Sequence, residues 1–330
     1  MMESQVIKCR ICSNTKKNEI LTCKEMTLGT RDSFNYIFCS SCNSLSILEI
    51  PENLDVYYSK YPNLNGKIKK LSLINKVLYN YILSKDNFFS KAIFKAIQSY
   101  QGLTYKSLYP YKLSKKMKIL DIGCGNGTLI HHLKSLGYSN SKGIDPFLPK
   151  KYISSNIEQK DIFMMTEKFD LIMFHHTFEH MHNFSDICQK INSLLHPGGL
   201  CVIRMPNIES YSFKTFKENW EGIHAPFHLG LPSRKGMEIL FQNTNMKLIE
   251  TRWEQPFYLF FYSLNHRVNI ADFDDLGARN FFEKGFIFKR IPPLFTNSEF
   301  NYWKKKAKLI SKTDRCDYIN YYYRKFDDIT

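Results

Sequence analysis

The sequence predicts an α/β protein built around a mostly parallel β-sheet, and three features predict it. Apolar segments of strand length alternate with amphipathic helical segments between residues 117 and 253. Such alternation is typical of βαβ units, in which each helix returns the chain to start the next parallel strand. A glycine-rich turn, 123–127, directly follows the first strand. No apolar run has the ~18 residues of a membrane span, so a globular fold is expected.

The elements can be assigned in chain order. The predicted strands are 117–122, 142–145, 157–159, 169–174 and 200–205, and the predicted helices among them are 128–136, 184–195 and 233–243. Residues 247–253 and 257–262 are predicted to form an antiparallel pair at one edge of the sheet. Apolar residues at helical spacing predict further helices between residues 67 and 100.

Four parts are expected along the chain. Residues 1–50 carry paired cysteines, 51–115 form a linker and a helical lead-in, 116–263 form the main domain, and 264–330 form a C-terminal appendage. The linker is recognised by turn-forming residues, namely Pro51, Pro62, Asn63, Asn65 and Gly66.

The glycine turn predicts a ligand site. Glycine permits positive φ and a close approach of the backbone to a ligand, and open α/β sheets bind ligands at the carboxyl ends of their strands. Asp121 precedes the glycines, where its carboxylate would repel a pyrophosphate but suits a ligand that carries an ammonium and a sulfonium. Asp145 ends the second strand, where an acidic side chain accepts hydrogen bonds from ribose hydroxyls. The spacing Gly-x-Gly-x-Gly also differs from that of dinucleotide-binding dehydrogenases.

These residues together resemble the class I S-adenosylmethionine-dependent methyltransferase family. Residues 169–172 with 178–180, and the turn 194–199 (Leu-Leu-His-Pro-Gly-Gly), are similar to further motifs of that family. The resemblance covers about 116–253 and implies a Rossmann-like, doubly wound sheet of seven strands with S-adenosylmethionine as cofactor. The cofactor-binding residues that it implies are Asp121, Gly123, Cys124, Gly125, Gly127, Asp145, Pro146, Asp161 and His175. The side chain of Cys124 is expected to pack rather than to react.

Paired cysteines near the N-terminus predict a metal site. Cys9 and Cys12 form one Cys-x-x-Cys pair, and Cys39 and Cys42 form a second. Four thiolates at this spacing fit a structural zinc with no open position, and the segment between the pairs could form a β-ribbon. The alternative is four unrelated buried cysteines.

A zinc-knuckle segment ahead of such a domain resembles bacterial methyltransferases that belong to surface-polysaccharide and modified-sugar pathways. Residues 36–42, Pro51 and 57–61 fit the N-terminal pattern of that group. The resemblance implies methyl transfer to a sugar of a glycan or a nucleotide-linked precursor. Sugar C-methyltransferases of the group have a longer C-terminal domain than 264–330, so a hydroxyl or amine acceptor is favoured. An RNA methyltransferase and a non-catalytic cofactor-binding module are the alternatives.

Histidines are the candidate catalytic bases, because imidazole suits proton transfer at neutral pH. The segment 220–228 resembles a conserved element of the same group, and His228, His224 and His180 are the candidates in that order. Each could instead be a structural histidine bonded to backbone. The aromatic residues Tyr211, Phe213 and Trp220 could stack on a sugar or pack in the core.

The formal charge of +15 is compatible with nucleic acid but is spread over the chain. Lysine, asparagine, isoleucine, phenylalanine and tyrosine are all abundant, which favours a general compositional bias over a dedicated basic patch. The N-terminus lacks a basic region followed by an apolar one, so a cytoplasmic protein is expected. A small molecule or glycan is therefore favoured over nucleic acid as the partner.

Overall fold

The computed structural model describes residues 7–60, 68, 70–84, 87–97, 107–109, 111–283 and 291–327. Pro51 lies within these ranges. The other residues that predicted the linker, Pro62, Asn63, Asn65 and Gly66, lie outside the described residues.

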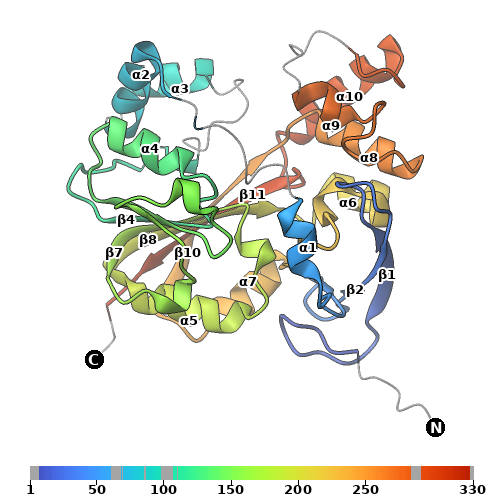
Figure 1. Ribbon diagram of the computed structural model, residues 1–330, viewed down its shortest axis with the longest axis horizontal. Coiled ribbons are helices and arrows are strands. Elements are labelled where there is room, and N and C mark those ends of the chain that lie inside the picture. Colours follow the sequence, from blue (N-terminus) through green and yellow to red (C-terminus); the bar gives the residue numbers. More distant parts are fainter. Residues whose placement is uncertain are drawn as a thin grey trace.

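A seven-stranded sheet forms the centre of the molecule (Figure 1). Its order is β10-β11-β8-β7-β4-β5-β6, and all strands except β11 run in the same direction. The strands are β4 (Ile119–Ile122), β5 (Ser141–Ile144), β6 (Ile157–Glu158), β7 (Phe169–His175), β8 (Leu195–Pro206), β10 (Met246–Glu254) and β11 (Tyr318–Lys325). The predicted α/β fold with a mostly parallel, seven-stranded sheet is confirmed.

Helices cover both faces of this sheet (Figure 1). On one face lie α2 (Leu73–Ser84) and α4 (Thr128–Ser135), whose side chains share a buried cluster with Ile119 and Leu171. On the other face lie α5 (Phe184–Leu194) and α7 (Arg234–Phe241). Because it is covered on both sides, β7 is apolar along almost its whole length, as parallel strands usually are. The helical lead-in also contains α3 (Phe88–Ile97).

The predicted edge pair is half wrong. Residues 247–253 lie in β10, but the second predicted strand, 257–262, lies mostly in helix α8 (Leu259–Arg267). A short continuous apolar run fits a buried helix as well as a buried strand, and this one is buried as a helix. The strand that pairs with β10 is β11, so the segment 264–330 supplies the seventh strand of the sheet. Between α8 and β11 lie α9 (Ala278–Glu283) and α10 (Asn297–Ile310).

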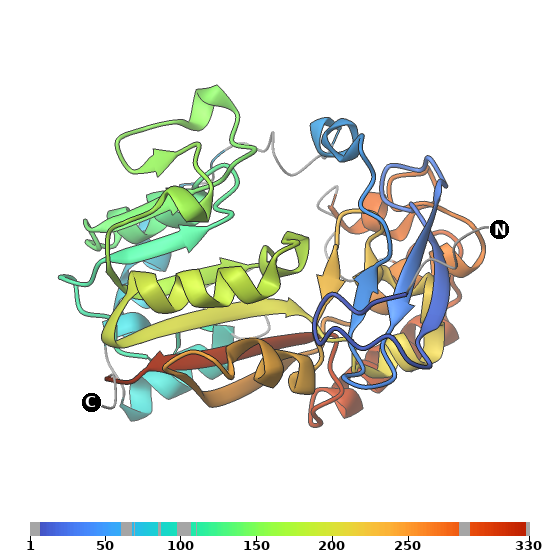
Figure 2. The same ribbon diagram turned by 90° about the horizontal axis from the view of Figure 1, so that it is seen from below.

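The N-terminal residues form a small module beside the main sheet (Figure 2). Strands β1 (Glu19–Lys24) and β2 (Ser33–Phe38) form the predicted ribbon, and β3 (Leu45–Ile47) extends it. The fourth strand of this second sheet is β9 (Gly230–Leu231), which follows His228 in the main domain. Two further helices, α1 (Leu54–Ser59) and α6 (Tyr211–Phe216), lie close to this module.

Five short 3-10 segments complete the described structure. They are Lys150–Tyr152, Ile162–Met164, Phe178–His180, Lys217–Asn219 and Glu221–Ile223. Among the described residues, no helix combines the length and the apolar character that crossing a bilayer requires.

Candidate active site

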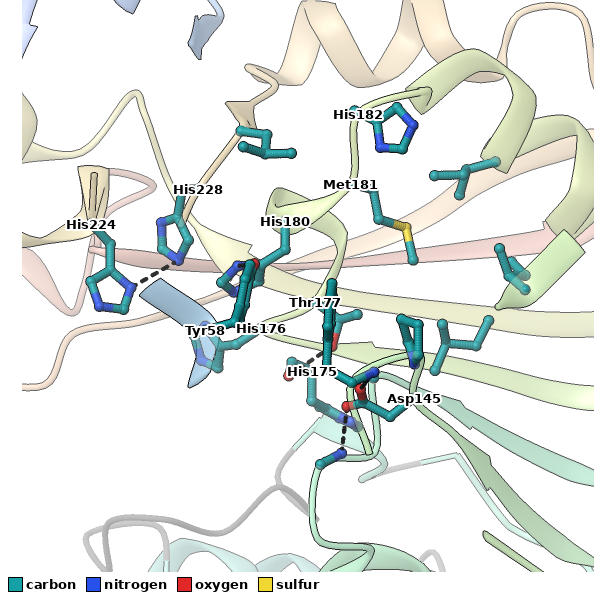
Figure 3. A pocket seen from close by; sticks show the side chains of 18 of the residues that line it. Tyr58, Asp145, His175, His176, Thr177, His180, Met181, His182, His224 and His228 are labelled. Atoms are coloured by element: carbon teal, nitrogen blue, oxygen red, sulfur yellow. Dashed lines mark hydrogen bonds between the residues drawn. The ribbon is translucent and has the colours of Figure 1, made fainter. Parts of the chain in front are cut away.

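A cavity of about 820 Å³ lies at the carboxyl ends of the parallel strands. One part of its lining follows strands β4, β5 and β7, where open α/β sheets bind ligands. The other part comes from His180, from residues 221–229 and from α1, which follows the N-terminal module. Figure 3 shows the resulting arrangement, with Asp145 and His175 in one region and a group of histidines in the other.

The glycine turn forms the floor of the first part. Gly123 and Gly125 line the cavity and both have positive φ, +70° and +54°. A Cβ at Gly123 would lie 2.3 Å from the side chain of Thr177, so no larger residue fits there. A Cβ at Gly125 would meet nothing within 4 Å, which means that this glycine faces open space. A ligand can therefore approach the backbone at Gly125 closely.

Asp145 is held rigidly at the wall of the same part. Its Oδ2 accepts a hydrogen bond from Gly125 N (3.0 Å), and its Oδ1 accepts one from Phe147 N (2.9 Å). Burial raises the pKa of this carboxyl, and the negative charge of Asp121 adds to the effect. Each carboxylate oxygen can accept a second hydrogen bond, so Asp145 can bind a pair of ribose hydroxyls.

The structure places the other predicted cofactor residues around this wall. Six of the nine line the cavity: Gly123, Gly125, Asp145, Pro146, Asp161 and His175. Asp121 lies behind His175, with 3.6 Å between its Oδ1 and His175 Nδ1. The Sγ of Cys124 lies 2.8 Å from where a Cβ at Gly143 would be, so it packs as expected. Gly127 precedes α4 at the N-cap.

The second part of the cavity is lined by all three predicted histidines, His180, His224 and His228. Nδ1 of His228 lies 2.9 Å from the carbonyl oxygen of Gly222. A carbonyl oxygen can only accept, so Nδ1 carries the hydrogen and Nε2 carries the lone pair. This Nε2 lies 3.4 Å from His224 Nδ1 and 3.9 Å from Glu179 Oε1. Burial lowers the pKa of His228 and of His224 well below 6.5, so both are neutral at pH 7.

Glu179 lies fully buried against these histidines, and neither of its carboxylate oxygens has a hydrogen-bond partner among the described residues. Burial raises the pKa of Glu179 to about 8. The nearest ring nitrogen is Nδ1 of His176, at 3.3 Å from Oε1. Burial also lowers the pKa of His180 to about 4. With a pKa of about 8, the side chain of Glu179 is largely protonated at pH 7, and a nearby cation would favour its charged form.

Some residues in or behind the cavity wall were not predicted as site residues. Arg204 lies behind the wall, where it contacts the lining residue His176, pairs with Glu254 at 3.1 Å and lies over the ring of Tyr318. Arg204 is a charged residue in the otherwise apolar predicted strand 200–205, and this contrast could have marked it as a candidate site residue. Arg279 contacts Glu221 from the segment that sequence left unassigned, and no local pattern marks it.

Tyr58 of α1, just after the N-terminal module in the chain, also reaches the cavity. Its ring stacks on Phe147 with 4.7 Å between centroids, and its hydroxyl lies 2.9 Å from His180 Nδ1. The aromatic residues predicted to stack on a sugar or to pack lie elsewhere. Phe213 and Trp220 are buried in the core and Tyr211 packs against it, and the Trp220 Nε1 donates to Asp317 Oδ1 at 3.2 Å.

The four paired cysteines come together, as the sequence predicts. Sγ of Cys9 lies 3.7 Å from that of Cys42, Sγ of Cys12 lies 3.5 Å from that of Cys39, and all four lie within 4.8 Å of one another. A tetrahedral zinc with bonds of ~2.3 Å requires sulfur separations of about 3.8 Å. The hydrogen bond between Cys9 and Cys42 lowers the pKa of the Cys42 thiol below its usual value. The donor set therefore fits a structural zinc.

Comparison with known proteins supports the fold. A family model described as a methyltransferase domain matches residues 99–251. A search among curated proteins finds no match. Coclaurine N-methyltransferase is similar in structure, with 18% identity, coverage of 83% of this chain and 82% of that one, and a TM-score of 0.43. The cyclopropane synthase of Mycobacterium tuberculosis has 16% identity, coverage of 84% and 99%, and a TM-score of 0.45.

A methyltransferase of Archaeoglobus fulgidus has 16% identity, coverage of 63% and 85%, and a TM-score of 0.37. Because these TM-scores are below 0.5, the assignment rests on the matched family and on the strand order observed here. Residues 99–251 therefore match the model of a methyltransferase domain, and the strand order observed here is the mostly parallel arrangement that the sequence predicted.

Proposed function

We propose that the protein transfers a methyl group from S-adenosylmethionine to a hydroxyl or amine of a sugar. The sugar would belong to a glycan or a nucleotide-linked precursor in the synthesis of cell-surface polysaccharide, in the cytoplasm. The observation that carries the proposal is the continuity of the cavity. It joins a cofactor wall at Gly125 and Asp145 to a region lined by His180, His224 and His228.

The cofactor wall suits S-adenosylmethionine in both shape and charge. Gly125 leaves room for the ligand, and the fixed carboxylate of Asp145 can accept hydrogen bonds from ribose hydroxyls. Asp121 and His175 would lie near the amino-acid end, and Pro146 and Asp161 near the base. When bound, S-adenosylmethionine supplies an electrophilic methyl group on a sulfonium.

The histidine region suits an acceptor that loses a proton. His228 is buried and neutral, and because Nδ1 is engaged with Gly222 O, its lone pair lies on Nε2, which faces His224 Nδ1 at a long 3.4 Å. Nε2 therefore accepts the proton of the acceptor, and His224 and His180 are the next candidates for this role. The surrounding Tyr58, Glu221 and Arg279 offer hydrogen-bonding groups for a hydroxyl-rich ligand. This polar lining, with the resemblance to sugar-modifying enzymes, supports a sugar as acceptor.

The test is transfer of a labelled methyl group. Purified protein is incubated with tritiated S-adenosylmethionine and with nucleotide sugars, cell-envelope glycans or RNA in separate reactions. Label on a sugar hydroxyl or amine is the expected result. Label on RNA would replace the proposal with the RNA alternative. Cofactor binding in calorimetry without transfer to any of these acceptors would favour a non-catalytic module.

Asp145→Ala is expected to weaken S-adenosylmethionine binding about 10- to 150-fold. The change removes a charged hydrogen-bond acceptor, and the loss expected from it is ~1.5–3 kcal/mol in total. Isothermal titration calorimetry measures the affinity. Asp186→Ala is the matched control, because Asp186 is exposed on α5 and is not among the residues that line the cavity. Equal affinity of the two variants would remove Asp145 from the cofactor site.

A further inference from the structure

We propose that Glu179, His180 and His228 bind a divalent first-row transition-metal cation in the acceptor region of the cavity. One ligand atom from each residue lies within 4.8 Å of those of the other two. This site is separate from the four-cysteine centre. The inference rests on the proposed function for its chemical role only, because cation binding itself requires neither cofactor nor acceptor.

The orientation of the two histidines supports the site. Nδ1 of His228 donates to Gly222 O, and Nδ1 of His180 lies 2.9 Å from Phe227 O, to which it donates in the same way. Both Nε2 atoms therefore carry lone pairs. Histidines that bind metals almost always donate their other ring N–H to a backbone carbonyl or a carboxylate, which fixes the tautomer and the ring. Two histidines of one cavity that are both fixed in this way are prepared for a cation.

Glu179 supplies an independent observation. Its side chain is completely buried, and neither oxygen has a hydrogen-bond partner within the described structure. Nδ1 of His176 lies 3.3 Å from Oε1, but burial lowers the pKa of this imidazole well below 6.5, so it brings no charge. The guanidinium of Arg204 is already paired with Glu254. Buried charges in proteins are paired or coordinate a metal, and a cation between Glu179 and His228 would satisfy both Oε1 and Nε2. The present separation of 3.9 Å between these two atoms is close to that of ligands around one ion.

The ligand set indicates the kind of cation. Two imidazoles and one carboxylate suit zinc and its neighbours in the first transition row, whereas magnesium and calcium prefer oxygen ligands. Three protein ligands leave at least one coordination position open, as in catalytic metal sites. Because His180 and His228 line the cavity, the open position faces the place proposed for the acceptor.

A cation here would activate the acceptor as a Lewis acid. The acceptor hydroxyl oxygen would bind at the open position, which lowers its pKa. Its proton would pass to His224, which is in contact with His228 at 3.4 Å. The oxygen would then form a bond to the methyl carbon while the carbon–sulfur bond breaks and its electron pair stays on sulfur. In the metal-loaded protein, His228 is thus a ligand, and His224 takes over as base.

The test is the zinc content of the full-length protein, measured by mass spectrometry after saturation with Zn²⁺ and dialysis. Wild type is expected to hold two zinc ions per chain, and Glu179→Gln one. Competition with a chelator should show that the change weakens the second ion at least about 100-fold, since even outer partners of metal ligands contribute 10–100-fold. His182→Ala is the control, because His182 lines the cavity but is exposed and outside the cluster.

A single zinc per chain in wild type would overturn the proposal. So would two zinc ions per chain in Glu179→Gln. If Glu179→Gln does not fold, His180→Gln takes its place, and two zinc ions in that variant would overturn the proposal in the same way. Methyl transfer is measured separately. If wild type held one zinc and still transferred methyl groups, the metal site alone would be refuted. If wild type held two zinc ions and transferred no methyl group, the proposed function alone would be refuted.

Discussion

Cys39→Ser is expected to abolish methyl transfer while leaving S-adenosylmethionine binding nearly unchanged. The serine removes one of four thiolates, and structural zinc contributes roughly 10–16 kcal/mol to the folding of small zinc modules. The secondary structure of the N-terminal module is limited to a short hairpin, β1–β2, and the three residues of β3, and its remaining burial is against the main domain. Loss of the metal should therefore unfold it.

The module is expected to matter for turnover because it is joined to the acceptor region. Strand β3 pairs with β9, two residues after His228, and the Tyr36 hydroxyl donates to the His228 carbonyl at 2.9 Å. Ser233 also donates to the carbonyl of Cys42, a predicted zinc ligand. Tyr58, which follows the module in the chain, contacts His180. The hydrogen bonds that hold Asp145 come from Gly125 N and Phe147 N of the main domain, and Tyr58 reaches this wall by stacking on Phe147.

Zinc content, turnover and calorimetric cofactor affinity of Cys39→Ser test this coupling together. Cys23→Ser is the matched control, because Cys23 is buried in the same module but is not part of the four-cysteine centre. Retained turnover in a Cys39→Ser protein that has lost one zinc would contradict the coupling. Loss of cofactor binding as well would show that the module supports the whole fold and not the acceptor region.

The local part of the fold could be predicted from the chain. Strand β4, the glycine turn and α4 are adjacent in sequence, so their apolar period and their glycines specify strand, turn and helix together. The partner of β10 could not be found in this way. Strand β11 lies more than sixty residues further along the chain, and the nearer apolar run at 259–262 was the more obvious candidate. Pairing between distant segments leaves little trace in local patterns.

The residues of the candidate site also differ in how far the local sequence predicts them. Gly125 and Asp145 lie at strand ends, where a parallel sheet collects ligands, so their positions follow from the predicted strands. Glu179 lies in the motif 178–180, but the sequence gave it no role, because its lack of a hydrogen-bond partner when buried is a property of the folded molecule. Arg279 reaches the cavity from α9, in the segment 264–330, where no helix or strand could be assigned from the sequence.

His228→Ala is expected to lower kcat about 10²- to 10⁴-fold, the usual contribution of a positioned acid or base, with cofactor affinity unchanged. The alanine removes Nε2, which either accepts the proton of the acceptor or binds the proposed cation. It keeps the carbonyl that accepts from Tyr36, so the attachment of the N-terminal module is preserved. The loss of the bond to Gly222 O should cost only ~1 kcal/mol of stability.

Steady-state kinetics with a competent acceptor, together with calorimetry of S-adenosylmethionine, separate catalysis from folding in this variant. Added imidazole should restore part of the turnover of His228→Ala, because a free imidazole can enter the vacated space, whereas a purely structural role would not respond. His182→Ala should retain wild-type kcat. If His228→Ala turned over at the wild-type rate, neither proton transfer nor metal binding at this residue could be required, and the chemistry would have to be reassigned to His224 or His180.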